Sequence, residues 1–345
     1  MTDWKRKSGV YLLSAALLLV FGLMLTAKPL HAASPLQVRI SLVNLPGDIL
    51  VDGAEWMGKK ITEYSNGSIV PKVYHSGVLS GTNGAAEIEM TQQGTIQIEI
   101  TSSAYLDSMV PQTSVVSLPF MFKSLDQEIA FADAKPPILD EIGKRLETKN
   151  LKVIAWWPRG FRQLTNSKQP VRNLQDLKDM RVRVQTSKIY TDVMNALGAK
   201  PVPMAVGEVY NALQLKTIDG QENAETVIFA NKYMEVQKYL SIWDYATDFE
   251  VVVVNLPWWN KLTPEQRSVL ERVAKESVQF EAGLVRKDVK ERREYLTTKG
   301  GMQMNIVDAP AREAMKKAVE PVWRDYTRIY GQKFVDDFKT AVNKY

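Results

Sequence analysis

Residues 37–74 read QVRISLVNLPGDILVDGAEWMGKKITEYSNGSIVPKVY, and the order of patterns within them indicates a fold class. Their first eight residues alternate apolar and polar side chains, as a half-buried strand does. Asp48 then provides an N-cap for an amphipathic helix that ends at Asn66-Gly67. Residues 70–74 predict a second strand. A strand, a helix and a strand in this order predict an α/β fold with a parallel sheet.

The same alternation of elements continues along the chain. The further strands that we expect lie at 95–101, 153–157 and 180–184, and the further helices lie at 85–93, 188–197, 208–215 and 225–240. Residues 221–223 are interpreted as a polar link into the last of these helices. Residues 34–345 are long for one hydrophobic core and suit two domains.

An unusually long helix is expected near the C-terminus. The sequence Thr263-Pro264-Glu265-Gln266 offers an N-cap, a proline at the first helical position and a glutamine that completes a capping box. Apolar residues then recur at helical spacing until Gly300-Gly301, which predicts roughly 35 helical residues, well beyond the usual three turns. A helix of this length is reasonable if it runs along two domains and joins them.

Residues 1–33 have the parts of a secretory signal. Three basic residues at 5–7 precede an uncharged, mostly apolar run at 8–27, and small residues follow at Ala32 and Ala33. The run of 20 residues is just long enough to span a bilayer, so an uncleaved anchor is the alternative to a cleaved signal. In both cases the rest of the chain is expected outside the cytoplasm.

Composition excludes several classes of function. The net charge is +5, but residues 34–345 carry 40 basic and 38 acidic side chains, and this balance argues against a nucleic-acid partner. The chain has no cysteine, which excludes disulfides, a thiolate nucleophile, a cysteine zinc site and a lipidated cysteine.

The chain also offers little to an enzyme. His75 is the one histidine after residue 33, and a single histidine cannot form a multi-histidine metal site. Residues 53–60 (GAEWMGKK) approach a P-loop, but Lys60 stands where the motif needs Ser or Thr, and the segment lies in a helical pattern. We therefore expect no catalytic residue, no metal site and no cofactor.

Two segments of the chain each contain a pair of arginines. Arg162 lies in a loop after the strand at 153–157. Arg159 lies close to it in the sequence, so either arginine could contribute to a binding site. Arg181 and Arg183 lie two residues apart in a strand and share one face, so periodicity does not choose between them. A guanidinium group offers a planar pair of donors that matches both carboxylate oxygens.

Four segments together resemble the solute receptors of TRAP transporters, the DctP-type periplasmic substrate-binding proteins. They are SLPFMF at 117–122, GFRQLTNS at 160–167, LKDMRVRV at 177–184 and PVPMAVGEVYNALQLKTIDGQEN at 201–223. Their order and spacing are similar to those of the family, and the resemblance extends from about residue 37 to the C-terminus.

The resemblance implies a set of ligand-binding residues. Arg183 stands where the family has the arginine that forms a two-pronged salt bridge with the ligand carboxylate. Arg162 and Asn223 match residues that assist at the same or a second polar group. The other positions at which the family lines its pocket are Trp157, Asn44, Ser102 and Tyr245. Three departures from the family pattern, Val206, Gln185 and Ala224, concern the size and shape of the pocket.

The resemblance also implies an architecture and a function. The fold would be the two-domain, Venus-flytrap type of periplasmic binding proteins, with a long helix spanning both domains. The first domain would comprise 34–158 plus 249–288, and the second 159–248 plus 289–345.

In this reading the chain is a monomeric periplasmic receptor for a small carboxylate: a C4-dicarboxylate, a sugar acid or an aromatic acid. It would deliver this solute to the small and large permease subunits of a sodium-coupled TRAP transporter. The alternatives are a receptor for another transporter or a sensor, and, in a different class, a secreted hydrolase.

Overall fold

The segment at 37–74 forms the edge of the first of two β-sheets. The structure, a computed structural model, describes residues 34–345, so the expected signal segment at 1–33 lies outside the described residues. Sheet A has the strand order β2 (Ile69–Tyr74), β1 (Leu36–Ser41), β3 (Ile98–Ser102), β10 (Thr247–Asn255) and β4 (Leu151–Phe161). β1 and β3 are parallel, whereas β10 runs antiparallel to both of its neighbours.

The helix between β1 and β2 forms because its own sequence supplies an N-cap, an apolar face and a stop signal. α2 (Ile49–Tyr64) begins at Asp48, whose side chain accepts a hydrogen bond from the Leu50 backbone nitrogen. The helix ends before Asn66 and Gly67, which both have positive φ, the backbone region that glycine and asparagine adopt most readily. Its apolar face, which includes Met57 and Ile61, is fully buried.

The second sheet is built from the middle of the chain. Sheet B has the strand order β11 (Gln303–Ile306), β9 (Tyr239–Ile242), β5 (Gln163–Asn166), β8 (Gly220–Asn223), β6 (Arg181–Val184) and β7 (Lys200–Pro203). β6 is parallel to β7 and β8, and β5 is antiparallel to β8 and β9. Both sheets are therefore mixed, each with a parallel part.

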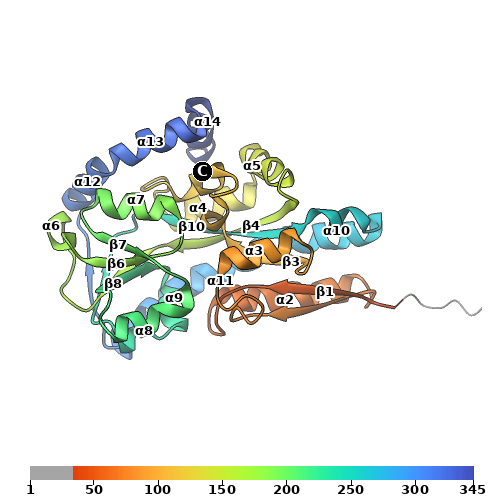
Figure 1. Ribbon diagram of the computed structural model, residues 1–345, viewed down its shortest axis with the longest axis horizontal. Coiled ribbons are helices and arrows are strands. Elements are labelled where there is room, and N and C mark those ends of the chain that lie inside the picture. The colour runs from red at the N-terminus through yellow and green to blue at the C-terminus, as the bar shows by residue number, and fades with distance from the viewer. Residues whose placement is uncertain (1–33) are drawn as a thin grey trace, which may run out of the picture. The chain divides into compact units, whose positions relative to one another are not determined.

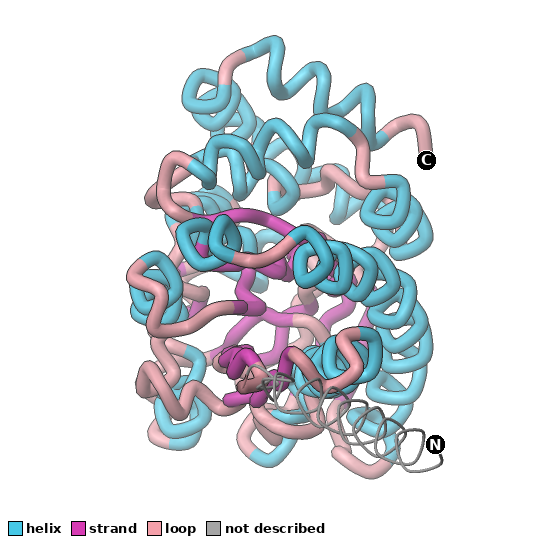
Figure 2. The backbone as a smooth tube through the Cα atoms, turned by 90° about the vertical axis from the view of Figure 1, so that its right-hand side faces the viewer, coloured by secondary structure: helices cyan, strands magenta, loops and turns pink. Residues whose placement is uncertain are grey.

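Helices surround the central strands of the two sheets (Figure 2). The α-helices besides α2 are α3 (Gly84–Gln92), α4 (Leu125–Ala134), α5 (Pro137–Glu147), α6 (Leu174–Leu177), α7 (Lys188–Ala196), α8 (Val209–Gln214), α9 (Glu225–Ala230), α10 (Leu256–Lys261), α11 (Pro264–Thr298), α12 (Ala309–Ala318), α13 (Glu320–Tyr330) and α14 (Gln332–Val342). The short 3₁₀ helices are η1 (Ser103–Leu106), η2 (Pro111–Ser117), η3 (Val206–Glu208) and η4 (Tyr233–Glu235). Within residues 34–345, no helix combines the length and the apolarity that a membrane span requires.

The chain passes between the sheets on two neighbouring strand segments. β4 of sheet A ends at Phe161 and β5 of sheet B begins at Gln163, so Arg162 alone separates them. On the return, β9 of sheet B leads into β10 of sheet A. The two segments are hydrogen-bonded to each other, because Phe161 pairs with Thr247 and the Arg162 backbone nitrogen donates to the Ala246 carbonyl oxygen at 2.9 Å.

Helix α11 is a third connection between the two sheets. It has the predicted capping box at Thr263 and Gln266, and its 35 residues confirm the expected length. It packs against α2 and β4 on the side of sheet A and against α9 on the side of sheet B. The C-terminal helices also contact both sides, because α13 packs on α7 while α14 packs on α4 and α5 (Figure 1).

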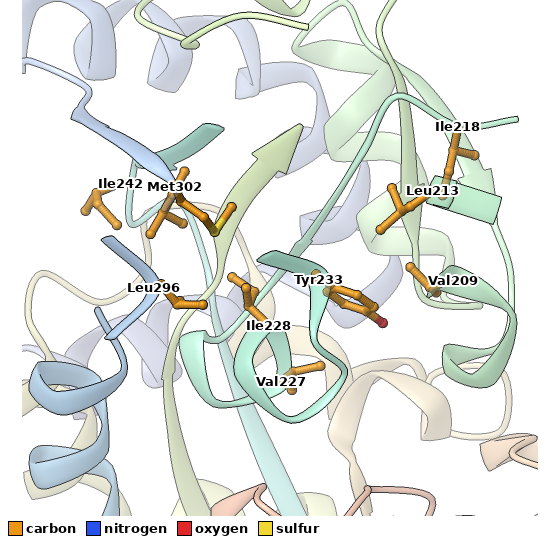
Figure 3. Close-up of a cluster of buried hydrophobic side chains, with 10 residues drawn as sticks. Val209, Leu213, Ile218, Val227, Ile228, Tyr233, Ile242, Leu296 and Met302 are labelled. Atoms are coloured by element: carbon orange, nitrogen blue, oxygen red, sulfur yellow. The ribbon is translucent and has the colours of Figure 1, made fainter. Parts of the chain in front are cut away.

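Each sheet has its own hydrophobic core. The core beside sheet B gathers side chains from α8, α9, β9 and the end of α11, including Val209, Ile228 and Leu296 (Figure 3). On the other side, Phe131 of α4 packs against Phe249 of β10 and Phe338 of α14. Burial of large apolar side chains stabilises each core by about 1.5–3 kcal/mol per residue.

Two sequence-based expectations are wrong between residues 221 and 240. The expected polar link at 221–223 is strand β8, whose backbone pairs with β5 on one side and β6 on the other. The expected helix at 225–240 ends at Ala230, because Lys232 adopts a left-handed backbone conformation with φ of 55°. The end of that segment is β9, which pairs with β5 and β11.

Candidate functional site

The carboxyl ends of strands from both sheets meet at one pocket. The strands that end there are β1, β3 and β4 of sheet A and β6 and β8 of sheet B, and in α/β folds this edge is where ligands bind. The cavity volume is about 40 Å³. The lining residues are Val43, Asn44, Ile100, Thr101, Ser102, Tyr105, Arg159, Arg162, Arg183, Gln185, Val206, Asn223, Val227, Asp248 and Glu250.

Arg183 is buried in this pocket with much of its hydrogen-bonding capacity unused. Its Nε and Nη2 atoms donate to the Met204 carbonyl oxygen at 3.1 and 2.7 Å, and Nη1 has no hydrogen-bond partner among the described residues. Arg183 as a whole is 1% exposed, and within residues 34–345 no carboxylate forms an ion pair with it. A buried guanidinium group without a counter-ion is costly, so this atom group is suited to an anionic ligand.

Arg181 lies at the other end of the same strand. Its side chain is 43% exposed and pairs with Asp219 at 2.8 Å, and it also donates to the Lys216 carbonyl oxygen. The two arginines that periodicity could not separate therefore differ in burial and in partners, and only Arg183 lines the pocket.

Arg162 lines the pocket but is already held by two carboxylates. It forms ion pairs with Glu222 of β8 and, at 3.0 Å, with Asp248 of β10, and its guanidinium lies 4.5 Å from the centre of the Tyr190 ring. Burial lowers the pKa of Arg162, but the Glu222 carboxylate outweighs this effect and holds the pKa well above its usual value. Arg162 thereby links a strand of sheet B to a strand of sheet A.

Arg159 is the second arginine of the pocket that forms ion pairs with carboxylates of the protein itself. Its Nη1 and Nη2 atoms each donate to one oxygen of Asp48 at 2.7 Å, and its Nε atom lies 3.7 Å from Glu250 Oε1. Burial raises the pKa of Asp48, but the charge and the hydrogen bonds of Arg159 lower it further, so the pKa lies below its usual value. Asp48 is thus a buried anion with two functions: it caps α2 and pairs with Arg159.

Three smaller polar residues predicted from the sequence also line the pocket. Asn223 accepts a hydrogen bond from the Ala224 backbone nitrogen at 3.2 Å, which leaves its Nδ2 donor without a partner among residues 34–345. Asn44 donates to Asp48 at 2.7 Å. The Ser102 hydroxyl donates to Asp248 at 2.8 Å and accepts from Gln185 Nε2 at 3.0 Å, so Gln185 joins the two walls of the pocket.

Two predicted site residues lie behind the pocket rather than in its lining. Trp157 is fully buried against α11, where its Nε1 atom donates to the Ser277 hydroxyl at 2.8 Å. Tyr245 is also fully buried, and its hydroxyl donates to Glu222 at 2.8 Å. The structure therefore does not bring either aromatic ring into the cavity.

The acidic residues of the pocket were missed by sequence reasoning. Asp248 and Glu250 lie on one face of β10, two residues apart, before the apolar run Val251–Val254. Scattered carboxylates are usually solvated, but a charged pair at strand spacing that opens an apolar run was a signal for a buried polar face. Burial raises the pKa of Asp248 and raises that of Glu250 to about 8.

The donor set gives no sign of a metal centre. Among residues 34–345, no three His, Cys, Asp or Glu side chains are grouped so that they could hold a metal ion. The polar side chains that line the pocket offer ion pairs and hydrogen bonds.

Comparison with known proteins identifies the class. The model of the bacterial extracellular solute-binding proteins, family 7 (DctP), matches residues 40–329, and the chain belongs to this family of TRAP-transporter solute receptors. Its relatives and structural neighbours are binding proteins rather than enzymes, and its two-domain α/β fold is theirs.

Individual relatives bind different acids. The chain is 32% identical to the 2,3-diketo-L-gulonate-binding periplasmic protein YiaO of Escherichia coli over 228 residues, 66% of this chain and 68% of that protein. It is 28% identical to the C4-dicarboxylate-binding periplasmic protein DctP of Rhodobacter capsulatus over 312 residues, 90% and 92% of the two chains. A crystal structure of a TRAP periplasmic solute-binding protein from Chromohalobacter salexigens with bound D-glucuronate matches with a TM-score of 0.83 and 27% identity, over 88% of this chain and 99% of that one.

Proposed function

We propose that the protein binds a small organic acid through Arg183 and delivers it to the small and large membrane subunits of a sodium-coupled TRAP transporter. One observation carries the first part: of the three arginines that line the pocket, Arg183 alone has no carboxylate partner within residues 34–345. A ligand carboxylate would supply that partner, and the Asn223 amide would add a donor beside it. The membership of the chain in a family of transporter receptors supports the second part.

Binding would be coupled to movement of the two domains. We assign residues 34–158 plus 249–288 to one domain and 159–248 plus 289–345 to the other. The passage of the chain between the sheets at Arg162 lies close to the first of these boundaries, and the small cavity between the walls supports a cycle of opening and closure.

We further propose that residues 1–33 are a signal peptide and that the receptor acts as a monomer in the periplasm of a Gram-negative cell. The basic start and apolar run of this segment support export. The relatives YiaO and DctP are described as periplasmic, which is consistent with it.

The test begins with a thermal-shift screen of organic acids, because a ligand that binds only the folded protein raises its melting temperature. Calorimetry with the acid that binds then compares Arg183→Ala with wild type. Removing one member of a buried charge pair costs about 2–5 kcal/mol, so we expect affinity to fall by roughly 30-fold to several-thousand-fold. Arg183→Lys should also lose affinity, because an ammonium group cannot make two parallel hydrogen bonds.

Arg181→Ala is the matched control on the same strand, and it should bind within about twofold of wild type because Arg181 faces solvent and Asp219. If Arg183→Ala bound the acid as tightly as wild type does, the assignment of the ligand carboxylate to Arg183 would be refuted.

A further inference from the structure

Glu250 is a buried carboxyl group in the pocket wall that makes no hydrogen bond within residues 34–345. It is 6% exposed and lines the cavity, and its closest charged neighbour is Arg159 Nε at 3.7 Å, beyond hydrogen-bond distance. Buried polar groups are nearly always hydrogen-bonded, so a group of this kind in a binding pocket indicates a missing partner on the ligand.

The neighbouring carboxylate does not have this property. Asp248 lies two residues away on the same face of β10, and its oxygens accept from the Ser102 hydroxyl and from Arg162 Nη1. Of the two carboxyl groups that line the pocket, Glu250 is therefore the one that needs a hydrogen-bond partner on the ligand.

The balance of charge restricts what else the ligand can carry. Arg159 and Arg162 are each paired with protein carboxylates, so Arg183 is left to neutralise one ligand carboxylate. A second ligand carboxylate would be buried near the Asp248 carboxylate without a cation of its own, which is strongly unfavourable. A ligand ammonium group at Glu250 would instead lie next to the guanidinium of Arg159.

We propose that Glu250 determines specificity by hydrogen-bonding a hydroxyl group of the ligand, and that the ligand is a hydroxy-monocarboxylate rather than a dicarboxylate or an amino acid. This inference rests on the proposed function, because it takes the ligand carboxylate to be held by Arg183. Burial raises the pKa of Glu250 to about 8, and a carboxyl group that is mostly protonated at neutral pH can both donate to a hydroxyl and accept from it.

The experiment uses paired probes that differ by one group. Calorimetry measures wild type with lactate and propanoate, with 3-hydroxybutanoate and butanoate, and with gluconate and hexanoate, and then with succinate and L-alanine. We expect at least one hydroxy acid to bind about tenfold or more tightly than its partner without hydroxyls, and succinate and alanine to bind more weakly than that hydroxy acid.

Variants then assign the preference to Glu250. Glu250→Leu should bind the hydroxy acid and its deoxy partner with affinities within about threefold of each other. Glu250→Gln, which keeps an acceptor oxygen and nearly the same shape, provides the measurement if the leucine variant does not fold, and it should retain part of the preference. Glu99→Gln is the matched control, because Glu99 is a buried glutamate on the adjacent strand β3 that does not line the pocket.

The outcomes separate the two proposals. If acids bind and need Arg183, but the hydroxy acid and its partner bind wild type equally, or succinate or alanine binds most tightly, the assignment to Glu250 is overturned while the receptor function stands. The assignment is also overturned if Glu250→Leu keeps the full preference. If acids bind equally well to Arg183→Ala, the proposed function itself fails.

Discussion

Glu128 of α4 should make the protein less stable as the pH rises from 4.5 to 8. Its Oε1 atom accepts hydrogen bonds from the backbone nitrogens of Arg159 and Gly160 at 2.9 and 3.1 Å, whereas Oε2 is buried without a partner within residues 34–345. Burial outweighs the two hydrogen bonds and raises the pKa of Glu128 from 4.5 to about 8. The carboxyl group is therefore protonated in the native protein at neutral pH.

The sign and size of the effect follow from linkage. Between pH 4.5 and 8 the native state keeps a proton that the unfolded state has lost, so the free energy of unfolding falls as the pH rises through this window. Each pH unit within it changes that free energy by about 1.4 kcal/mol. Between pH 5.5 and pH 8.5 the contribution of Glu128 therefore changes by about 3 kcal/mol, as an order of magnitude.

The variant Glu128→Gln isolates this contribution. Glutamine keeps an acceptor oxygen for the two backbone nitrogens but cannot ionise, so the variant should gain about 3 kcal/mol relative to wild type between pH 5.5 and pH 8.5. Urea unfolding followed by circular dichroism at the two pH values measures the difference. Glu250 titrates in both proteins and cancels in the comparison.

Glu55→Gln, at an exposed position on α2, is the control for the same substitution outside the core. If Glu128→Gln showed the same offset from wild type at both pH values, within about 0.5 kcal/mol, Glu128 would be ionised in the folded protein and the reasoning from burial would be wrong.

Two further predictions concern the framework of the pocket. Asp48→Asn should lower the free energy of unfolding by about 3–5 kcal/mol in urea titrations, because it leaves the Arg159 guanidinium buried without its bidentate partner; a loss below about 1 kcal/mol would contradict this. Gly160→Ala should destabilise by about 1–2 kcal/mol because φ is +85° there, whereas Gly283→Ala, in helix α11 with open space around the new methyl group, should stabilise by about 0.5–1 kcal/mol. Equal shifts in melting temperature for the two alanine variants would refute the argument from backbone conformation.

The parts of the fold that could be predicted from the sequence are those that local chemistry specifies. α2 and α11 have caps, apolar periodicity and stop signals within their own segments, and both were predicted within a few residues. β8 could not be predicted in this way, because its sequence GQEN is polar and it becomes a strand only between β5 and β6. The sequence of β9 predicts the end of a helix, and the reason for the error is similar: its strand partners lie near residues 165 and 304.

The same distinction holds for the site. Arg183 could be selected because a sequence motif surrounds it, and Asn44, Ser102 and Asn223 lie at strand ends, where pockets form. The partners that occupy Arg162 could not be foreseen, because Glu222 and Asp248 are 60 and 86 residues away in the chain. Ion pairs between residues that are distant in the sequence depend on the fold that brings them together. Such pairs cannot be predicted from the patterns of a single sequence.

The position of Arg162 between the sheets has a mechanical consequence. It lies where two neighbouring strand segments pass between the sheets, and its ion pairs join β8 to β10, so under the proposed domain movement it would lie at the hinge. Arg183 is on β6, which lies two strands away from β5 in sheet B. At the usual strand spacing, β6 is roughly 10 Å from β5. A rotation of about 15° would leave the ion pairs of Arg162 almost undisturbed while moving Arg183 by roughly 2–3 Å. The distance between Arg183 and Glu250 would then depend on the hinge angle. A solute could contact both residues at one hinge angle only if it had the right length and polarity.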